Sequence, residues 1–522
     1  MSSPKPLWRR LLRLLLLILA TLLLLVLSGL LLAGRLTPQA HGEVSHVLPL
    51  QPAQTALDRQ IVPLQETHPG HSGVAFLSDG MDAFAARSVI TEHAGRSLDL
   101  QYYIWHDDLV GHLLAKALYD AAERGVRVRI LLDDLNAKDK DALMMALDAH
   151  PNIEIRLYNP FRNRSGIART LELVQRAFSV NHRMHNKSWI ADGRIAIVGG
   201  RNIGEEYFSA RNDVNFQDLD LVVAGPAVQQ ANRIFDDYWN SDAAIPIAAL
   251  ASYTDAQLRE LVRQSDLDAL HAAAQPYLQR VIASRRLQRP SPDPLHWSAQ
   301  VRIVSDPPMK HRNDDRSGWL VSTLIAELES TRRAALLISP YFVPGAEGLE
   351  GLSALAADGA QVGVVTNSLA ANDVAAVHGG YMGYRVPLLK AGVQLYELKA
   401  QGQPGDASLF GSSGASLHTK AFVVDDRRGF VGSFNLDPRS AYLNTEMGVL
   451  FDDPVLGAQL RDEYLRLASP EHSWWLALDE DDRLRWLQRQ PPPHWVPAEP
   501  GSSLGKRWTA RLISWLPVES QL

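Results

Sequence analysis

The chain has 522 residues, of which 46% are hydrophobic and 21% are charged, and its net charge is −6. A chain of this length can form two or three domains with sizeable buried cores, because domains commonly contain roughly 100–200 residues. It contains no cysteine, which excludes disulfides, thiol nucleophiles and cysteine-based metal sites. The acidic balance argues against a dedicated nucleic-acid-binding protein, which would normally be basic.

The first expected element is an uninterrupted apolar run from Leu14 to Ala33. A helix of about 20 residues is roughly 30 Å long and matches the hydrocarbon core of a bilayer. Basic residues precede the run at Lys5, Arg9, Arg10 and Arg13. The positive-inside rule therefore predicts a transmembrane anchor over residues 1–36, with a cytoplasmic N-terminus and the remaining chain on the other side. The alternative is a cleaved signal peptide, whose apolar region would be shorter, about 7–15 residues, and residues 34–38 make a poor cleavage site.

Composition and periodicity divide the rest of the chain into four parts. A segment rich in Pro, Gln and His precedes the first alternation of strands and helices, and a Pro-rich run at Arg289–Pro294 marks a plausible boundary between two halves. The last part is rich in Trp and Pro. The expected parts are a linker at 37–70, a first domain with a helical insertion at 71–295, a second domain at 296–470 and a tail at 471–522.

The two halves show the same order of expected elements. In the first half, Ser97 to Trp105 predicts a buried strand, and Leu109 to Arg124 predicts a helix that ends before Gly125. Further strands at 126–132 and 153–158 and a hairpin at 185–198 complete this half. The second half repeats the order with a strand at 335–343, a helix at 349–357, strands at 361–366 and 393–398, and a second hairpin. The repeat predicts two like α/β domains, each a mixed sheet flanked by helices, packed together.

An eight-residue signature occurs once in each half. The first copy is His185-x-Lys187-x4-Asp192, and the second is His418-x-Lys420-x4-Asp425. A glycine-containing motif follows each copy at matched spacing, and these motifs end at Asn202 and Asn435. Two matched His-Lys pairs in two halves of one chain suggest a single active site shared across a pseudo-two-fold axis.

These residue types suit displacement at a phosphodiester. One imidazole can attack phosphorus, and the other can protonate the departing alkoxide and later deprotonate the incoming hydroxyl. Lys187 and Lys420 can balance the charge that builds on the phosphoryl oxygens, to which Asn202 and Asn435 add neutral donors. Because residues i and i+2 of a strand share a face, each His is expected to point the same way as its Lys.

Each histidine also needs an acceptor that fixes its tautomer. Alignment of the two strand-like runs on the apolar residue that follows each acid matches Asp220 with Glu446, and we assign these two as the orienting carboxylates. Asp192 and Asp425 belong to the signature and are included among the candidate catalytic residues. Because both lie beside hairpin turns, where Asp commonly serves the backbone, structural turn support is the favoured role for them.

The duplicated signature with its GGxN or GSxN follower resembles that of the phospholipase D superfamily. The resemblance covers roughly residues 70–470 and implies a phospho-histidine mechanism without metal or cofactor, with His185 as nucleophile and His418 as acid and base. Segments such as LDLQYYIWHDD, ISPYFVPG and SWLPVESQL look like those of bacterial cardiolipin synthases of the C type. Such enzymes transfer a phosphatidyl group onto a headgroup alcohol.

This resemblance implies a membrane phosphatidyltransferase that makes cardiolipin from phosphatidylglycerol and a second phospholipid, with phosphatidylethanolamine as a further substrate to consider. The alternatives are a phospholipase D, which uses water as acceptor, and a nuclease of the same superfamily, which the acidic balance disfavours. The expected partners are membrane phospholipids and no nucleic acid. The expected location is the bacterial inner membrane, with the catalytic domains in the periplasm.

The C-terminal tail contains an amphipathic stretch. Trp508, Leu512, Trp515 and Leu516 fall on one helical face, with basic residues beside them. The pattern is typical of a short helix that lies in a membrane interface. A C-terminal helix that docks on the protein core is the equally favoured alternative.

Overall fold

The computed structural model describes most of the chain outside the N-terminal segment. The described residues are 41–134, 141–161, 181–211, 215–250, 274–283, 295–312, 315–400, 417–516 and 519–521, with isolated positions at 17, 21, 163, 172, 254, 256 and 257. The expected anchor over 1–36 therefore lies almost wholly outside the described residues, as does the expected boundary at Arg289–Pro294. Among the residues that are described, no helix has the length and apolar character needed to cross a membrane.

The first half forms a nine-stranded mixed sheet in the order β8-β4-β3-β2-β5-β6-β7-β1-β9. Its strands are β1 (Ser72–Leu77), β2 (Ser97–Tyr102), β3 (Arg127–Asp133), β4 (Ile153–Tyr158), β5 (Ser188–Ala191), β6 (Ile195–Gly199), β7 (Asp220–Ala224), β8 (Ala244–Pro246) and β9 (His296–Ser298). Strands β2, β3 and β4 are parallel, and β5 runs antiparallel to β2. The expected hairpin is the antiparallel pair of β5 and β6.

The second half forms a ten-stranded mixed sheet in the order β10-β16-β15-β14-β11-β12-β13-β17-β18-β19. Its strands are β10 (Val301–Ser305), β11 (Ala334–Ile338), β12 (Gln361–Asn367), β13 (Gln394–Leu398), β14 (Lys420–Val424), β15 (Arg428–Gly432), β16 (Met447–Asp452), β17 (Ser473–Leu478), β18 (Leu484–Gln488) and β19 (His494–Val496). Eight strands follow one another in the same order in both sheets, from β8 to β1 and from β17 to β10. The predicted duplication of an α/β domain is confirmed.

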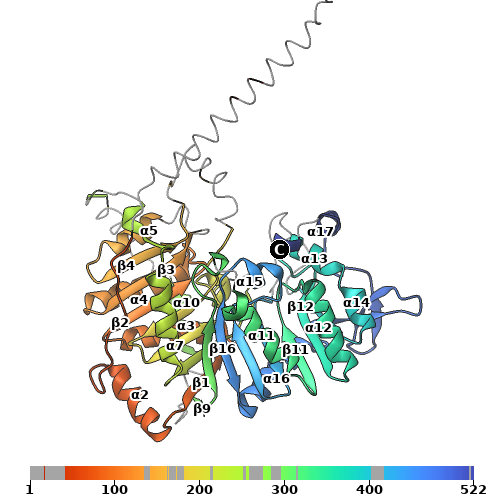
Figure 1. The fold of residues 1–522 in the computed structure, drawn as a ribbon, viewed down its shortest axis with the longest axis horizontal. Coiled ribbons are helices and arrows are strands. Elements are labelled where there is room, and N and C mark those ends of the chain that lie inside the picture. Colours follow the sequence, from red (N-terminus) through yellow and green to blue (C-terminus); the bar gives the residue numbers. More distant parts are fainter. Residues whose placement is uncertain are drawn as a thin grey trace, which may run out of the picture.

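Helices cover both sheets (Figure 1). In the first half they are α2 (Ala56–Thr67), α3 (Gly80–His93), α4 (Leu109–Glu123), α5 (Asp141–Asp148), α7 (Val228–Trp239) and α10 (Gln275–Ala283). In the second half they are α11 (Leu320–Glu329), α12 (Gly345–Ala357), α13 (Ala375–Met382), α14 (Arg385–Lys390), α15 (Pro438–Tyr442), α16 (Pro454–Leu467) and α17 (Leu504–Ser514). Gly125 follows α4 with a positive φ of 89°, which suits glycine and ends the helix where expected.

A shared apolar core joins the two halves, which lie side by side in Figure 1. It contains side chains from α7 and from α16 together with strand residues of both sheets, such as Val198 and Val449. Two short parallel bridges also cross between the halves, Met184 with Thr445 and Gln217 with Leu417. The chain of each half therefore reaches into the other next to the two signature histidines.

The expected boundaries differ from the structure in three places. The region expected to be a linker contains α2, whose first turn is capped by Thr55. β9 lies just beyond the expected start of the second domain but pairs with β1 of the first sheet. The expected tail supplies β17, β18 and β19, which extend the second sheet beyond β13. Edge pairing of this kind joins segments that are distant in sequence, so local periodicity does not reveal it.

Candidate active site

Backbone pairing between the halves brings each signature histidine to the opposite domain. The His185 amide donates to the Thr445 carbonyl at 2.8 Å, and the His418 amide donates to the Gln217 carbonyl at 2.7 Å. Thr445 directly precedes Glu446, and Gln217 directly precedes Asp218. Each histidine therefore lies beside the residue that introduces a carboxylate from the other half.

Each imidazole makes its carboxylate contact across the domain boundary. His185 Nδ1 lies 2.8 Å from Glu446 Oε2, and His418 Nδ1 lies 2.6 Å from Asp218 Oδ2. All four side chains are buried. A carboxylate at Nδ1 assigns the proton to that nitrogen, which leaves the lone pair of Nε2 directed away from the carboxylate. Neither half contains a complete histidine–carboxylate pair of this site.

The prediction for Asp220 is wrong, because Asp218 is the residue that meets His418. Strand register gives the reason: Gly199 pairs with Asp220 and Gly432 pairs with Gly448, so Asp220 is equivalent to Gly448. Glu446 is therefore equivalent to Asp218, two residues before the expected position. An apolar residue follows both Asp218 and Asp220, and residues two positions apart in a strand lie on the same face. The alignment on the following apolar residue therefore could not distinguish these two aspartates.

Asp220 has a structural partner instead. Its Oδ2 accepts from Arg87 Nη2 at 2.9 Å, and Arg201 Nη1 lies 3.4 Å away. Arg87 also donates to the Tyr102 hydroxyl. These buried ion pairs tie α3 and the glycine motif to β7, and they supply no contact to either histidine.

The residue two positions before each motif asparagine differs between the halves. Its size fits the length of the acidic side chain that it faces. A Cβ atom on Gly200 would lie 2.2 Å from Asp218 Oδ1, so only glycine leaves room for this shorter acid. Ser433 holds the equivalent position and donates from Oγ to Glu446 Oε2 at 2.5 Å. The two halves thus form the same histidine–carboxylate contact with different residue pairs, Gly200 with Asp218 in one half and Ser433 with Glu446 in the other.

The two lysines lie close to the histidines, as their spacing predicts. Lys187 Nζ donates to the His185 carbonyl and Lys420 Nζ donates to the His418 carbonyl. The regular strands begin only at Ser188 and at Lys420, so the His-x-Lys segments lie at the strand ends rather than inside them. Both ammonium groups are buried in the same site as two carboxylates, which keeps the local charge near balance.

Burial shifts the protonation of this cluster. Burial lowers the pKa of His185 to about 4 although Glu446 acts to raise it, and burial also lowers the pKa of His418. Burial lowers the pKa of Lys187 to about 7 and that of Lys420 to about 8. Near neutral pH the imidazoles are therefore neutral, as a nucleophile requires, and the lysines are poised to change charge when an anion binds.

Aromatic rings hold the two imidazoles in different ways. The Tyr103 ring meets His185 edge-on at a centroid distance of 5.0 Å. His418 lies against two rings: Phe216 stacks on it at 5.3 Å, and Tyr207 meets it edge-on at 5.2 Å. The sequence gives no signal for Phe216 and Tyr207, because neither residue belongs to a motif.

The two motif asparagines are not equivalent. Asn202 Oδ1 accepts from the Ile104 amide at 3.2 Å, and its Nδ2 donates to the Tyr207 hydroxyl at 3.0 Å. Asn435 Oδ1 is buried and has no hydrogen-bond partner within the described part of the chain. The structure therefore gives Asn202 a role in positioning Tyr207, and Asn435 is the stronger candidate for a substrate contact.

The aspartates that end the two signatures lie away from the site and bind backbone. Asp192 accepts from the amides of Gly95, Arg96 and Ser97, at the start of β2. Asp425 accepts in the same way from the amides of Arg332, Arg333 and Ala334, at the start of β11. Their inclusion among the candidate catalytic residues is therefore not supported, and the favoured turn-supporting role agrees with these bonds.

A buried ion pair between Asp306 and Lys310 holds the backbone of Glu446. Asp306 Oδ2 accepts from the Glu446 amide at 2.9 Å and from Lys310 Nζ at 2.9 Å. Lys310 also donates to the carbonyl of Ser440 in α15. Neither Asp306 nor Lys310 belongs to a motif, so only these contacts reveal that the pair positions Glu446.

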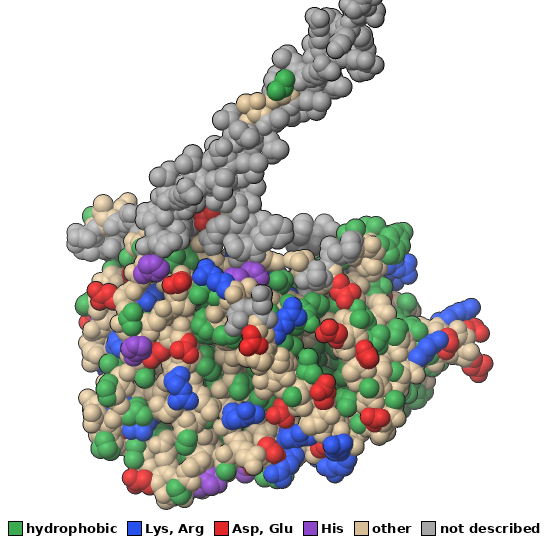
Figure 2. Space-filling view, viewed as in Figure 1, with side chains coloured by type: hydrophobic (Ala, Val, Ile, Leu, Met, Phe, Trp, Pro, Cys, Tyr) green, Lys and Arg blue, Asp and Glu red, His purple; other side chains and the backbone are tan. Residues whose placement is uncertain are grey.

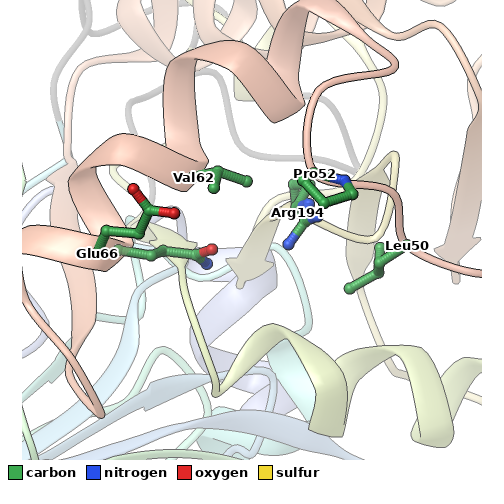
Figure 3. Close-up of a pocket in the computed structure, with 6 residues that line it drawn as sticks. Leu50, Pro52, Val62, Glu66 and Arg194 are labelled. Carbon is green, nitrogen blue, oxygen red and sulfur yellow. The ribbon is translucent and has the colours of Figure 1, made fainter.

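A surface pocket elsewhere in the first half is separate from this site. It has a volume of about 310 Å³ and is lined by residues that include Leu50, Val62, Glu66 and Arg194 (Figure 3). Arg194 lies in the turn after β5, at the opposite end of that strand from His185. Its guanidinium pairs with Asp58, which explains its position without a ligand.

Comparisons with known proteins find relatives that match both halves of the chain. A family model described as "Cardiolipin synthase, PLD-like domain" matches residues 90–239 and 324–468, so each half carries one match. Cardiolipin synthase C of Escherichia coli is 40% identical over 467 residues, which cover 88% of this chain and 98% of that protein. Cardiolipin synthase B of the same species is 26% identical over 81% of this chain and 90% of its own length.

A solved structure shows the same fold at low sequence identity. The crystal structure of phosphatidylserine synthase from Haemophilus influenzae superposes with a TM-score of 0.54 at 14% identity, covering 79% of this chain and 91% of that one. The family match extends over more than half of the chain, and the E. coli relative matches over nearly its full length. The chain therefore belongs to the cardiolipin synthase-like family of the phospholipase D superfamily.

Proposed function

We propose that this protein is a phosphatidyltransferase that makes cardiolipin from phosphatidylglycerol and a second phospholipid. The observation that carries the proposal is the exchange of carboxylates between the halves, His185 with Glu446 and His418 with Asp218. This exchange supports the proposal because two oriented imidazoles and two lysines are the set of groups that two successive displacements at phosphorus need. The match to cardiolipin synthases selects a phospholipid as the ester.

In the first step, His185 Nε2 forms a bond to phosphorus and the bond between phosphorus and the leaving headgroup oxygen breaks. His418 supplies the proton to that oxygen, so it must be protonated when the anionic substrate binds. Asp218 supports this state because it stabilises the imidazolium through Nδ1. Lys187 and Lys420 balance the charge on the two non-bridging oxygens, and Asn435 adds a neutral donor.

In the second step, His418 accepts the proton of an incoming hydroxyl, and that oxygen displaces His185 from phosphorus. With the glycerol hydroxyl of phosphatidylglycerol as acceptor, the product is cardiolipin. Water in the same position would give phosphatidic acid, so the acceptor distinguishes a transferase from a hydrolase. Glu446 stabilises the phosphorylated His185 through the Nδ1 proton in the interval between the steps.

The proposed substrates are membrane lipids, with phosphatidylglycerol as acceptor and phosphatidylglycerol or phosphatidylethanolamine as phosphatidyl donor. We place the protein at the bacterial inner membrane with its catalytic halves in the periplasm. The apolar run at Leu14 to Ala33 and the basic residues before it support that placement. A protease-accessibility assay on a C-terminal tag in spheroplasts tests it, with cleavage from outside as the expected result.

Lipid mass spectrometry in a bacterial host that lacks cardiolipin synthases tests the function. Expression of the chain should restore cardiolipin, and His185→Asn or His418→Asn should abolish it at equal protein levels. Supply of labelled phosphatidylethanolamine identifies the donor by the headgroup amine released. Accumulation of phosphatidic acid without cardiolipin would show a hydrolase, and unchanged lipids with cleavage of DNA or RNA in vitro would contradict the lipid function altogether.

A further inference from the structure

The C-terminal helix α17 is attached to the second half by one face only. Its buried Ala510 and its neighbour Ile513 lie against Gly379 of α13, where a Cβ atom would come within 2.7 Å of the Ala510 carbonyl oxygen. This close approach fixes the helix on α13, so the docking alternative considered for the tail is correct for that face. It leaves the opposite face without a protein partner among the described residues.

The uncovered face is apolar and contains two tryptophans. Residues at helical spacing form it, and we call it the α17 face: Leu504, Trp508, Leu512, Trp515 and Leu516, with exposed fractions of 73%, 61%, 53%, 74% and 57%. Arg511 lies exposed at its border. Figure 2 shows hydrophobic side chains gathered at the edge of the molecule where α17 lies in Figure 1. Tryptophans on an apolar helical face with a cation at the border are typical of helices that lie in a membrane interface.

The α17 face lies at the edge of the second sheet that carries the catalytic residues. His418 precedes β14, and β11 runs antiparallel to β14 while β12 runs parallel to β11. The carboxyl end of β12 is therefore at the same edge of the sheet as His418. α13 follows β12 there, and α17 packs on α13.

Hydrogen bonds connect α17 to the loop beside the catalytic histidine. Lys506 of α17 donates from Nζ to the carbonyls of Ala370 and Asn372, at 3.4 and 3.1 Å. This loop follows Asn367, the last residue of β12, whose side chain exchanges two hydrogen bonds with the backbone of Leu417. Leu417 directly precedes His418. The helix with the exposed tryptophans is thus braced on the segment that positions one of the two imidazoles.

We propose that the α17 face inserts into the headgroup region of a phospholipid bilayer and so holds the catalytic edge of the molecule against its lipid substrates. This inference rests on the proposed lipid function and adds the surface through which the site meets the membrane. Arg511 at the border complements the negative charge of phosphatidylglycerol headgroups. A second protein is a poorer fit, because the eleven-residue helix and the two residues after it, with five exposed apolar side chains in all, are small beside the roughly 800 Å² per partner of a standard interface.

Site-directed spin labelling of the full chain tests the position of the helix directly. Because the natural chain has no cysteine, Leu512→Cys gives a single labelling site without further changes. Val455→Cys is the matched control: it is similarly exposed, at 45%, and starts α16 at the opposite end of β16 from the catalytic edge. Both variants are reconstituted into vesicles of phosphatidylglycerol and phosphatidylethanolamine, and collisions of the label with oxygen and with a water-soluble nickel chelate are compared.

The label at position 512 is expected to collide more with oxygen and less with the nickel chelate than the label at position 455. Equal exposure of both labels to the nickel chelate would overturn the proposal. Protection of the label at position 512 from both reagents would also overturn it, because the face would then be covered by protein. The depth measurement needs no turnover, so it stands or fails independently of the lipid-synthesis assay.

An activity comparison gives the second test. The triple variant W508S/L512S/W515S should lower cardiolipin formation on vesicles by about 10-fold, because partition of the catalytic edge to the bilayer is weakened. Its rate on short-chain phosphatidylglycerol below the critical micelle concentration should stay within about 2-fold of the parent, since the site itself is unchanged. The control triple variant I325S/V455S/L465S also carries three apolar-to-serine changes, at exposed positions outside the α17 face. Equal losses on both substrates, or equal losses in both triple variants, would contradict the proposal.

Discussion

The two halves of the molecule share a strand order but complete their shared site with different side chains. In one, Gly200 leaves room for the short acid Asp218; in the other, Ser433 donates to the longer acid Glu446. Both combinations leave a carboxylate oxygen next to a histidine Nδ1, at 2.6 Å for His418 and at 2.8 Å for His185. The position of the carboxylate oxygen is thus maintained in the two halves, whereas the residue that supplies the oxygen differs.

The neighbours of the two imidazoles differ more than the carboxylates do. His418 contacts both Phe216 and Tyr207, whereas His185 meets only Tyr103 among the ring contacts of the described residues. In the proposed mechanism the two histidines have different tasks, since one bonds to phosphorus and the other only exchanges protons. Unequal surroundings agree with such a division of labour, and the variants below test how far it extends.

Removal of either histidine should have the largest effect. His185→Asn and His418→Asn should each lower cardiolipin formation by at least about 1,000-fold, because each removes a bond-forming or proton-transferring group. A phosphatidyl ester of p-nitrophenol distinguishes the roles, since this leaving group needs no proton. Release of p-nitrophenol, followed by absorbance in a single turnover, should persist in His418→Asn and be absent in His185→Asn. The reverse pattern would exchange the two roles.

The carboxylates should come next. Asp218→Asn and Glu446→Gln should each lower kcat by roughly 100-fold or more, because the imidazole loses the acceptor that fixes its tautomer. Asp220→Asn is the matched control and should instead destabilise the fold by about 3 kcal/mol, since it leaves Arg87 without its buried partner. Chemical denaturation and kcat per folded molecule separate the two effects. A larger loss of kcat in Asp220→Asn than in Asp218→Asn would contradict the corrected pairing.

The glycine motif gives a direct comparison of the halves. Gly200→Ala should lower kcat by about 10-fold to 100-fold, since its Cβ displaces the Asp218 carboxylate from His418. Ser433→Ala removes one hydrogen bond to Glu446 and should lower kcat only about 5-fold, which corresponds to about 1 kcal/mol. Steady-state rates on the same vesicles provide the measurement. Equal effects would mean that the two carboxylates are positioned in the same way.

The alkaline limb of the pH profile should reflect His418 and the two lysines. The lysine pKa values are lowered by burial to about 7 for Lys187 and about 8 for Lys420, so the free enzyme loses these charges as pH rises through that range. Because His418 must also hold a proton when substrate binds and burial lowers its pKa, kcat/KM should already decline as His418 loses that proton and should fall more steeply above about pH 7–8. On the acid side kcat/KM should persist until His185 is protonated near pH 4. In the substrate complex the phosphate anion favours the ammonium forms, so the alkaline limb of kcat should lie at higher pH. Coincident limbs for kcat and kcat/KM would contradict this electrostatic role.

The signature aspartates should have the smallest effect on catalysis. Asp192→Asn and Asp425→Asn should each leave kcat within about 3-fold of the parent but lower the free energy of unfolding by about 1–3 kcal/mol, because charged acceptors of backbone amides are lost. Asp192 should cost more, since it is fully buried and Asp425 is not. Denaturation curves combined with rates check both statements. A loss of kcat comparable to that of Asp218→Asn would restore a catalytic role to these aspartates.

The sequence predicted the repeated elements well because each is encoded locally. The strands, the helix after Trp105 and the two hairpins follow from periodicity and from stop signals such as Gly125. The paired histidines and lysines follow from a signature that occurs twice. Contacts between the halves could not be predicted in this way. The choice of Asp220 in place of Asp218 shows why. The two aspartates are distinguished by strand register, which is set by the pairing of β6 with β7 and by the bridge of Gln217 to Leu417.

Other parts of the site had no local signal. Phe216 and Tyr207 reach His418 only after the chain has folded, and Asp306 supports Glu446 from a loop 140 residues away in sequence. The strands of the C-terminal tail were missed for the same reason, because β17 pairs with β13 across the edge of a sheet. The amphipathic pattern of α17 was visible, but which of its faces is covered became clear only from its contact with Gly379.

The stereochemical course at phosphorus tests the central claim most directly. The proposed mechanism uses two in-line displacements, first by His185 and then by the acceptor hydroxyl, and each inverts the configuration at phosphorus. Transfer from a phosphatidylglycerol phosphorothioate of one configuration should therefore give a product with net retention, as measured by ³¹P magnetic resonance. Net inversion would mean that the acceptor attacks the lipid directly, and it would contradict a covalent phospho-histidine intermediate.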